Sequence, residues 1–382
     1  MTSKQRVEAA FRGAPVDRIP VNHRGFSGPS SEVILGRRAY TGGAIQRWNE
    51  AVALWEGRHE EFIEQAYSDA VEIAFATGQD LVRAKYWGEG TKPTERLDEN
   101  SFLFAYGEEV DWRVMKYFPD IEEVSVMPYR EFNVGIEYVR VKTAQLEKFA
   151  ADYKPVEQSF YEPLRFLREY GDTYAVEVGG ASIGIGQDYM PAWLEAMITD
   201  PPLVKAMLDA QAQIGLKNIS FVTERGLKYI TGGTDFCSEQ GPMYSPAMFA
   251  EFVLPGLKKM CGHCRKNNAH YLFASDGNLW PVADYVFGQS GVDGFFEIDR
   301  KAGMDLAKLR QEFPHLTCIG NLSSWTLALG SGQDVRDEVV SCCQAAKKYN
   351  GVIVGVSNAV QPETPKENII CMLEALEENR NI

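Results

Sequence analysis

The sequence predicts an α/β fold, a (β/α)8 TIM barrel with an N-terminal helical extension and an insertion around residues 86–135. Short β-rich runs alternate with amphipathic helical segments from Gly171 onward, which is typical of βαβ units and a parallel sheet. With an early strand at Ile19–Asn22 and another near Asp80–Ala84, the strands reach the eight that close a barrel. A doubly wound open sheet is the structural alternative, but no G-x-G-x-x-G motif opens a helix after the first strand.

The first part of the chain carries the extension and the insertion. Residues 3–12 have the pattern of a helix, and a Pro-rich segment leads from there to the first strand. The segment Ser27–Gly43 is rich in Gly and Ser and is predicted to be a long loop, whereas Ile45–Thr77 has apolar residues at helical spacing. Between residues 86 and 135, Gly and Pro breakers alternate with aromatic residues, which predicts small antiparallel strands and a candidate lid.

The second part of the chain supplies the repeating units of the barrel. The predicted strands are Thr173–Val178, Lys228–Thr231, Tyr271–Ala274, Gly294–Phe296, Leu316–Ile319 and Val352–Val356. The predicted helices are Pro202–Arg225, Pro246–Asn268, Leu279–Gln289, Asp305–Phe313, Asp334–Tyr349 and a capped C-terminal helix over Pro362–Arg380. Every strand is thus followed by a segment long enough to cross back over a sheet.

Composition bounds the class of protein. At 382 residues the chain exceeds one average domain, but an elaborated barrel reaches this size, so residues 1–382 are predicted to form a single domain. No run of about 18 apolar residues is present, and the N-terminus lacks the apolar core of a secretory signal. These features and seven scattered cysteines predict a cytoplasmic protein without a membrane segment. A net charge of -14 without a basic stripe argues against nucleic-acid binding.

Polar side chains follow the predicted strands, and a barrel brings the carboxyl ends of its strands together at one mouth. Aspartate also caps helices and forms turns, so each carboxylate taken alone has an equally good structural explanation. Their joint appearance at strand ends favours a site for acid or base chemistry, for an oxygen-rich metal site or for a polar ligand. The candidates are His23, Arg24, Asp235, Glu239, Gln240, Ser275, Asp276, Asn278, Glu297, Asp299, Asn321, Ser357 and Asn358.

Three further features have a structural explanation. Cys261 and Cys264 form a C-x-x-C pair, but it lies inside a predicted helix and not at the helix N-terminus where a thiol is activated, so a structural role is favoured. His270 precedes its strand, at the end opposite the mouth, and is also predicted to be structural. An aromatic set either sandwiches a flat ligand or packs in the core; it comprises Tyr161, Tyr189, Met190, Trp193 and Trp280.

A set of motifs along nearly the whole chain, the insertion excepted, resembles the uroporphyrinogen decarboxylase superfamily. They begin at Arg12-Gly-Ala-Pro-Val-Asp-Arg-Ile-Pro-Val and include Gly233-Thr-Asp235, Gln240-Gly-Pro, Ser245-Pro246, Ser275-Asp276-Gly277-Asn278, Gly303-Met-Asp-Leu, Ile319-Gly-Asn321 and Gln361-Pro-Glu-Thr-Pro-Lys-Glu-Asn368. The resemblance implies a (β/α)8 barrel, in agreement with the strand count. It also implies either a decarboxylase or a zinc methyltransferase that passes methyl groups to or from a corrinoid.

This sequence departs from the family pattern at several positions, and these departures bear on the choice between a decarboxylase and a zinc methyltransferase. True decarboxylases carry an Arg-rich segment after the first strand, where only Arg24 remains here, and a Gly-His-Gly near the last strand, where Ser357-Asn358-Ala359 stands. The methyltransferases hold zinc through a His-x-Cys, an acidic residue and a late Cys. Here these places are taken by Ala274-Ser275-Asp276, Glu297 and Val356 or Ser357. Asp276 and Glu297 are the remaining metal candidates, and two oxygen donors argue against a thiolate-binding zinc.

The resemblance therefore favours a methyltransferase that moves a methyl group from a small methoxylated or methylated compound to a corrinoid, as aromatic O-demethylases do. It implies a corrinoid-binding protein as partner, and a homodimer is an open possibility. Asp276, Glu297 and Asp235 are the expected catalytic residues. The expected substrate-binding residues are His23, Arg24, Glu239, Asn278, Trp280, Asn321, Ser357, Asn358 and Tyr189. The alternatives are a decarboxylase of a tetrapyrrole-like or small carboxylate, with His23 and Arg24 gripping the acid, and a non-catalytic ligand-binding relative.

Overall fold

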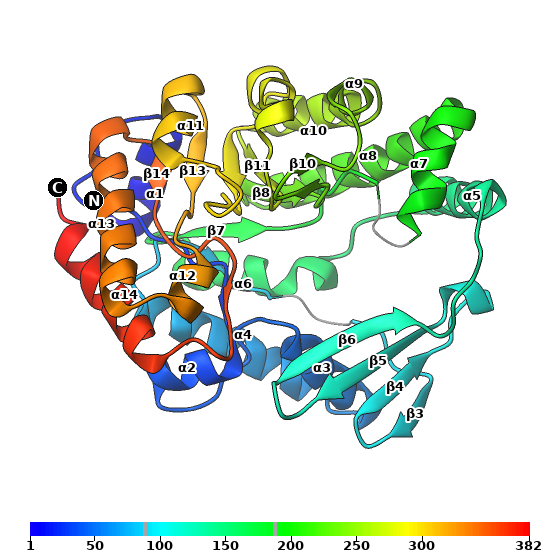
Figure 1. Cartoon of the computed structure of the whole chain (residues 1–382), viewed down its shortest axis with the longest axis horizontal. Helices are drawn as coiled ribbons and strands as arrows, with labels where there is room; N and C mark the ends of the chain where they lie inside the picture. The colour runs from blue at the N-terminus through cyan, green and yellow to red at the C-terminus, as the bar shows by residue number, and fades with distance from the viewer. Residues whose placement is uncertain (87–89, 186–188) are drawn as a thin grey trace.

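A computed structural model describes residues 1–86, 90–185 and 189–382. Its core is a curved parallel sheet in which hydrogen-bonded neighbours run in the order β14-β13-β12-β11-β8-β7-β2 (Figure 1). The strands are β2 (Leu81–Arg83), β7 (Ala175–Val178), β8 (Tyr229–Gly233), β11 (His270–Ala274), β12 (Gly294–Phe296), β13 (Thr317–Ile319) and β14 (Val352–Ile353). The seven runs predicted from residue 80 onward therefore all contain strands.

The segment after the Pro-rich stretch closes the sheet into a barrel. Val21 forms a parallel bridge with Val354, next to β14. On its other side the Val21 carbonyl accepts hydrogen bonds from the amides of Asp80 and Leu81, at 2.8 and 3.3 Å, where β2 begins. Residues 20–24 thus occupy the eighth position between β14 and β2. The predicted (β/α)8 barrel is confirmed.

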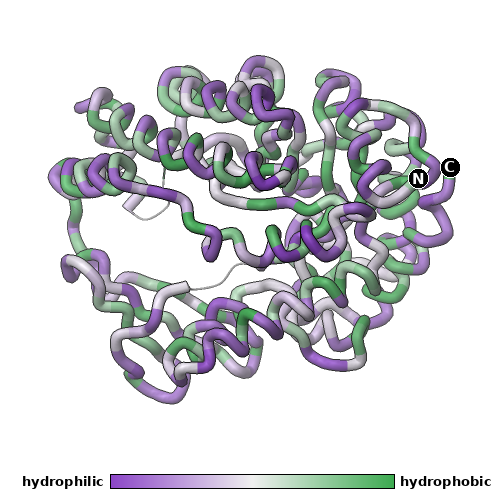
Figure 2. Tube along the Cα trace, turned by 180° about the vertical axis from the view of Figure 1, so that it is seen from behind, coloured by the Kyte–Doolittle hydropathy of each residue, from purple (hydrophilic) through white to green (hydrophobic). Residues whose placement is uncertain are grey.

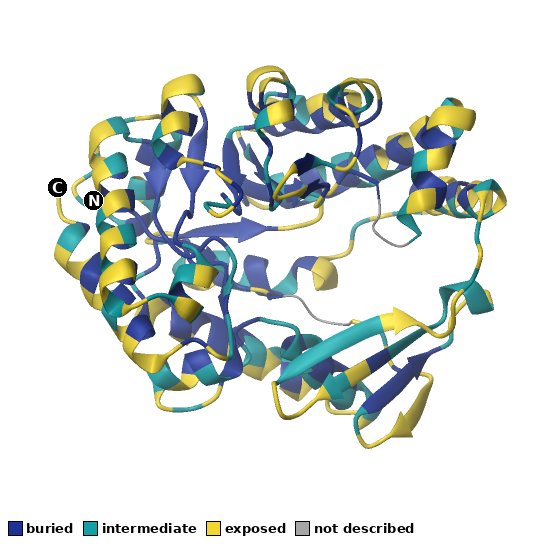
Figure 3. Ribbon diagram, in the orientation of Figure 1, coloured by how far each residue is buried: buried dark blue, intermediate teal, exposed yellow. Residues whose placement is uncertain are grey.

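Helices surround the barrel because each carries one apolar face that packs on the strands (Figures 1 and 3). Figure 2 shows hydrophilic and hydrophobic residues alternating along these outer helices. The amino-terminal helix α1 (Ser3–Phe11) covers one end of the barrel, where Val7 and Ala10 pack with Leu81 and Leu272. The outer helices include α5 (Ile136–Asp152), α6 (Tyr161–Tyr170), α7 (Met190–Thr199), α8 (Pro201–Thr223), α10 (Leu254–Lys266), α11 (Leu306–Glu312), α12 (Ser324–Leu329), α13 (Gly332–Tyr349) and α14 (Lys366–Asn379).

The predicted loop Ser27–Gly43 is partly wrong, because it contains helix α2 (Gly28–Leu35). The Ser27 hydroxyl accepts a hydrogen bond from the Ser30 amide, a proline stands in the first turn, and Gly36 ends the helix in the left-handed conformation (φ 70°). Those are ordinary start and stop signals of a helix, and the many small residues masked them. The predicted helix Ile45–Thr77 is divided into α3 (Ile45–Trp55) and α4 (His59–Ala76).

The insertion forms a four-stranded antiparallel sheet, as its composition predicted; residues 87–89 of the predicted range lie outside the described residues. Its strands are β3 (Glu95–Asp98), β4 (Ser101–Phe104), β5 (Arg113–Phe118) and β6 (Glu123–Pro128), in sequential order. The sheet packs against α3, where the Trp48 ring lies 4.9 Å from that of Phe102 and 5.4 Å from that of Tyr117 (Figure 1). The role of the insertion as a lid stays a prediction.

Within the described ranges, no helix has both the length and the apolar character that a bilayer-spanning segment requires. Cys261 and Cys264 are buried within α10, in agreement with their predicted structural role. His270, at the start of β11, stacks on Phe11 with ring centroids 4.6 Å apart and lies 3.5 Å from Asp293. It therefore belongs to the closed end of the barrel, as the sequence indicated.

Candidate active site

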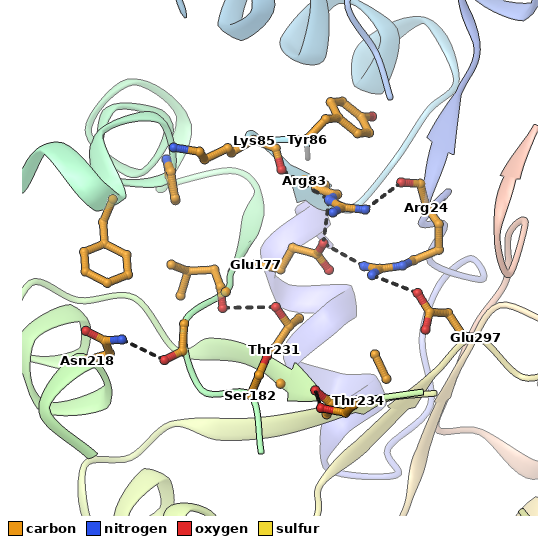
Figure 4. Close-up of a pocket in the computed structure, with 18 of the residues that line it drawn as sticks. Arg24, Arg83, Lys85, Tyr86, Glu177, Ser182, Asn218, Thr231, Thr234 and Glu297 are labelled. Carbon is orange, nitrogen blue, oxygen red and sulfur yellow. Dashed lines mark hydrogen bonds and ion pairs between the residues drawn. The ribbon is translucent and has the colours of Figure 1, made fainter. Parts of the chain in front are cut away.

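A cavity of about 630 Å³ opens at the carboxyl ends of the strands (Figure 4). In a (β/α)8 barrel this is the face at which catalytic residues gather. The polar and aromatic residues that line it come from the ends of β2, β7, β8, β11 and β12 and from the segments beside them. They include Arg24, Arg83, Lys85, Tyr86, Tyr153, Ser159, Phe160, Glu177, Ser182, Asn218, Thr231, Thr234, Asp235, Asp276 and Glu297.

Three carboxylates from separate strand ends meet in this cavity. One side-chain oxygen from each of Asp235, Asp276 and Glu297 lies within 4.8 Å of the others. The Asp276 amide donates to Oδ1 of Asp235 over 3.1 Å, and the Asn358 amide group donates to Oδ2 of Asp276 over 2.9 Å. The three predicted catalytic residues are thus brought together, with Asn358 holding one of them.

The turn that presents Asp235 requires glycine. Gly233 ends β8 with φ +119°, and a Cβ at this position would lie 2.3 Å from the carbonyl oxygen of Ala274 on the neighbouring strand. Only glycine combines that backbone conformation with such a close approach. Because β8 and β11 pack this tightly at their ends, Asp235 and Asp276 come within hydrogen-bonding reach.

The electrostatics of the cluster favour the protonated forms of Asp276 and Glu297. Burial, followed by repulsion from Glu297 and Asp235, raises the pKa of Asp276 to about 7. Burial also raises the pKa of Glu297, although Arg24 opposes that shift. A carboxyl group that is partly protonated near neutral pH is able to donate a proton to a bound molecule.

Arg24 links Glu297 of the acid cluster to Glu177 on strand β7. Its guanidinium donates to Oε1 of Glu177 and to Oε1 of Glu297, each over 3.1 Å, and lies 4.6 Å from the ring centroid of Phe296 (Figure 4). Arg83 donates to the Arg24 carbonyl over 3.0 Å and approaches Glu177 at 3.7 Å. Burial lowers the pKa of Arg83 to about 10, so it stays charged at neutral pH.

Sequence reasoning missed several members of the cavity wall. Glu177 and Arg83 lie within the strands β7 and β2, whereas the predicted site residues are those that follow the strands. A charged residue within the otherwise apolar run Ala175–Val178 was the available signal for Glu177. The wall also has an aromatic part formed by Tyr86, Tyr153 and Phe160. No sequence pattern distinguishes these three from core aromatics.

Three of the predicted substrate-binding residues lie beside the cavity without lining it. His23 is fully buried, its Nδ1 accepts a hydrogen bond from the Val356 amide over 3.2 Å, and burial lowers its pKa to about 3. Asn321 and Ser357 both donate to the carbonyl of Ile298, at 3.0 and 3.1 Å. These contacts hold the segment that follows Glu297. In the described structure the three residues therefore support the site.

Of the other predicted substrate-binding residues, Arg24 lines the cavity, whereas Glu239, Asn278, Trp280, Asn358 and Tyr189 do not belong to the described lining. Glu239 is exposed and forms an ion pair with Lys301 at 2.8 Å. Oδ1 of Asn278 accepts a hydrogen bond from the Trp280 amide, and the Trp280 indole donates to the Gly303 carbonyl. The Tyr189 hydroxyl reaches the Val110 carbonyl over 3.2 Å, so this side chain contacts the insertion. The predicted aromatic set of Tyr161, Tyr189, Met190, Trp193 and Trp280 supplies none of the described residues that line the cavity.

The donor set does not fit a zinc ion that activates a thiol. Such a site uses histidine and cysteine ligands in a tetrahedral shell. The described cluster has three carboxylates, and the Arg24 guanidinium already forms an ion pair with Oε1 of Glu297. Ala274 and Asp276 stand where the family's histidine and cysteine are expected. Carboxylate oxygens suit harder cations better than zinc.

The structure therefore defines the class of protein as a (β/α)8 barrel in which a cluster of three carboxylates lies at the carboxyl ends of the strands. The sequence model of the family described as Uroporphyrinogen decarboxylase (URO-D) matches residues 180–379, more than half of the chain. The chain belongs to this family. No curated protein sequence matches it.

Comparison with solved structures supports the fold through one of three matches. A methyltransferase from Methanosarcina mazei has 17% sequence identity, a TM-score of 0.65, and a match that covers 99% of each chain. The IolI protein with a bound zinc atom has 13% identity over 64% of this chain and 98% of its own, with a TM-score of 0.26. D-Psicose 3-epimerase with D-tagatose, from Clostridium cellulolyticum H10, has 12% identity over 66% and 95%, with a TM-score of 0.27. Only the first of these scores is high enough to indicate a shared overall fold.

Proposed function

We propose that this protein is a methyltransferase that takes a methyl group from a small methoxylated or methylated compound and gives it to a corrinoid carried by a partner protein. The observation that carries the proposal is the Asp276 carboxyl group, whose pKa is raised to about 7 inside the cavity. Membership of the uroporphyrinogen decarboxylase family and the fold shared with a methyltransferase support it. The loss of the His-x-Cys pair is consistent with an oxygen leaving group that needs a proton and not a metal-bound thiolate.

The proposed reaction has a simple balance of bonds and charge. An ether oxygen is a poor leaving group, so it must gain a proton as the bond from carbon to oxygen breaks. The proton of Asp276 moves to that oxygen and leaves a carboxylate behind. The methyl carbon bonds to the reduced cobalt of the partner's corrinoid, which supplies the electron pair. The products are an alcohol or phenol and the methylated corrinoid.

The neighbours of Asp276 determine how well it works as an acid. Asp235 and Glu297 disfavour its ionised form by charge repulsion. Arg24 fixes Glu297 in place by a 3.1 Å contact, so the repulsion comes from a defined position. Asn358 donates to Oδ2 of Asp276 and thereby orients its carboxyl group. These contacts keep the proton near the position at which a bound ether oxygen would lie.

The decarboxylase alternative is less well supported. It needs a cation that is available to hold a substrate carboxylate. Arg24 already contacts Glu177 and Glu297, and His23 is buried with a lowered pKa and does not line the cavity. Arg24 is therefore already paired with two carboxylates, and His23 lies outside the cavity lining, so neither residue is available to bind a substrate carboxylate.

The test uses the full chain, chemically reduced free cobalamin in place of the unidentified partner, and a panel of methoxylated aromatics and methylamines. Formation of the methylated cobalt species is followed by its absorbance spectrum. We expect methylation with at least one methoxylated member for the wild type, and a loss of 100-fold or more in Asp276→Asn. Glu239→Gln, which alters an exposed acid outside the cavity, is the matched control. No methylation above the protein-free rate across the panel would overturn the proposal.

A further inference from the structure

Glu177 is a buried carboxylate in the wall of the cavity that the proposed reaction does not use. It lies in strand β7 with only 5% of its surface exposed. Its strand neighbours Ala175, Val176 and Val178 are buried and apolar, so hydrophobic packing alone would favour an apolar residue here. A charged side chain held at such a position needs polar partners on the side that faces the cavity.

The two carboxylate oxygens of Glu177 have different surroundings. Oε1 accepts from the Arg24 guanidinium over 3.1 Å and has Arg83 at 3.7 Å. Oε2 is buried and has no hydrogen-bond partner in the described structure. Buried acceptors in folded proteins are nearly always satisfied by protein, water or ligand. Because Glu177 lines the cavity, a molecule bound there is the natural partner of Oε2 (Figure 4).

Charge balance selects the kind of donor. The guanidinium groups of Arg24 and Arg83 lie 3.1 and 3.7 Å from Oε1 of Glu177, so this carboxylate already has two cationic neighbours. An ammonium would add a charge beside two guanidinium groups, whereas a hydroxyl donates a hydrogen bond without adding charge. Aromatic side chains of Tyr86 and Phe160 also line the cavity and suit a flat ligand.

We propose that Oε2 of Glu177 binds an uncharged hydroxyl group of the substrate and so makes this residue a determinant of specificity. The expected substrate is then a compound that carries a free hydroxyl group in addition to its methoxyl group. The inference rests on the proposed function only for the identity of the methyl donor. It is tested by binding without turnover, so the two proposals are able to fail separately.

The experiment measures binding of matched pairs to the full-length protein by isothermal titration calorimetry. The hydroxyl pair is 2-methoxyphenol and 1,2-dimethoxybenzene, which differ only by methylation of the donor. The ammonium pair is trimethylammonium and tetramethylammonium. We expect the wild type to bind 2-methoxyphenol at least about tenfold more tightly than 1,2-dimethoxybenzene. Glu177→Gln replaces one carboxylate oxygen by an amide NH2 group, which donates and does not accept a hydrogen bond. This variant is expected to reduce the ratio to about twofold or less.

Glu162→Gln is the matched control. Glu162 is also buried, has one oxygen 3.3 Å from Lys85 and the other without a partner, and does not belong to the described cavity lining. Its replacement is expected to leave the hydroxyl preference unchanged. An unchanged preference in Glu177→Gln would overturn the proposal, as would absence of binding by both 2-methoxyphenol and 1,2-dimethoxybenzene. Discrimination within the ammonium pair alone would also overturn it and would identify a cation site.

A second measurement does not depend on the variant being folded. A crystal structure of the wild type soaked with 2-methoxyphenol is expected to place the phenol oxygen within about 3.2 Å of Oε2 of Glu177. A ligand whose hydroxyl lies elsewhere in the cavity would contradict the assignment. A purely structural role for Glu177 predicts no change in the hydroxyl preference, because such a role acts equally on both members of the pair.

Discussion

Replacing Asp276 by Asn should make the protein more stable than the wild type at neutral and alkaline pH, by an amount that grows between about pH 4 and pH 7 and is constant above that range. Asp276 has a folded-state pKa of about 7 in place of the ordinary 3.8, and burial is the largest cause. A raised folded pKa means that the protonated form contributes stability, fully below about pH 4, and that this stability is lost as the pH rises through about 7. Asparagine mimics the neutral carboxyl group at every pH, so the variant does not lose this stability as the pH rises.

The magnitude follows from the shift. About three pKa units at 1.36 kcal/mol each give an upper limit of about 4 kcal/mol for the advantage of Asp276→Asn at pH 8 relative to pH 4. The side chain is partly exposed, so water reduces this value. Urea denaturation of both proteins at several pH values between 4 and 8 measures the difference in the free energy of unfolding. Glu239→Gln, at an exposed acid paired with Lys301, is the control and should show a small difference at all pH values.

The reasoning is refuted if the difference between Asp276→Asn and the wild type stays constant, within about 0.5 kcal/mol, from pH 4 to pH 8. A constant difference would mean that Asp276 titrates at the same pH in the folded and unfolded chains. Its carboxyl group would then be ionised at neutral pH and could not act as the proposed acid. A difference of opposite sign would mean that the native state stabilises the carboxylate.

Three further predictions concern the site and the insertion. Arg24→Met should destabilise the fold by about 3–5 kcal/mol in urea denaturation, because Glu177 and Glu297 lose a shared buried partner; a cost near that of the exposed Arg225→Met would contradict this. Trp48→Ala should cost about 3 kcal/mol and speed protease cleavage of the insertion before that of the barrel; equal protection would show that α3 does not hold the sheet. Elemental analysis should find zinc well below one per chain, since the cluster has three carboxylates and no described thiolate; tightly bound stoichiometric zinc would show that the donor set was misjudged.

The barrel was predictable because its signals are repeated and local. Strands such as Tyr271–Ala274 and Gly294–Phe296 are short apolar runs bounded by turn residues, and each is followed by a helix-length segment. Helix α2 was missed for the opposite reason, since its capping residues lie in a segment whose glycines and serines suggested a loop. The end of the barrel at which each polar group lies follows directly from the direction of its strand.

The acid cluster was predictable in membership but not in environment. Asp235, Asp276 and Glu297 each follow a strand, so the fold alone brings them near one another. The raised pKa of Asp276 depends on burial and on a distance to Glu297 that spacing along the chain does not encode. Residues after strand ends, such as Asn278, turned out to form local turns, which a single sequence does not distinguish from ligand contacts.

The buried network on the opposite wall was not predictable from position alone. Arg24 was identified after the first strand, but its partner Glu177 lies 153 residues away, and their contact exists only because the barrel closes. The partner of Glu297 is again Arg24, at a separation of 273 residues. Pairings at such distances depend on the tertiary structure, so sequence reasoning named the residues that follow strands and missed those within them.

The most direct test of the central claim is the pH dependence of methyl transfer itself. Single-turnover rates from a methoxylated substrate to reduced cobalamin are measured for the wild type and Asp276→Asn between pH 5 and pH 9. If Asp276 is the acid, the wild-type rate falls as the pH rises through about 7, and the variant is slow at every pH. A wild-type rate that does not change with pH, or a variant as fast as the wild type, would contradict the account.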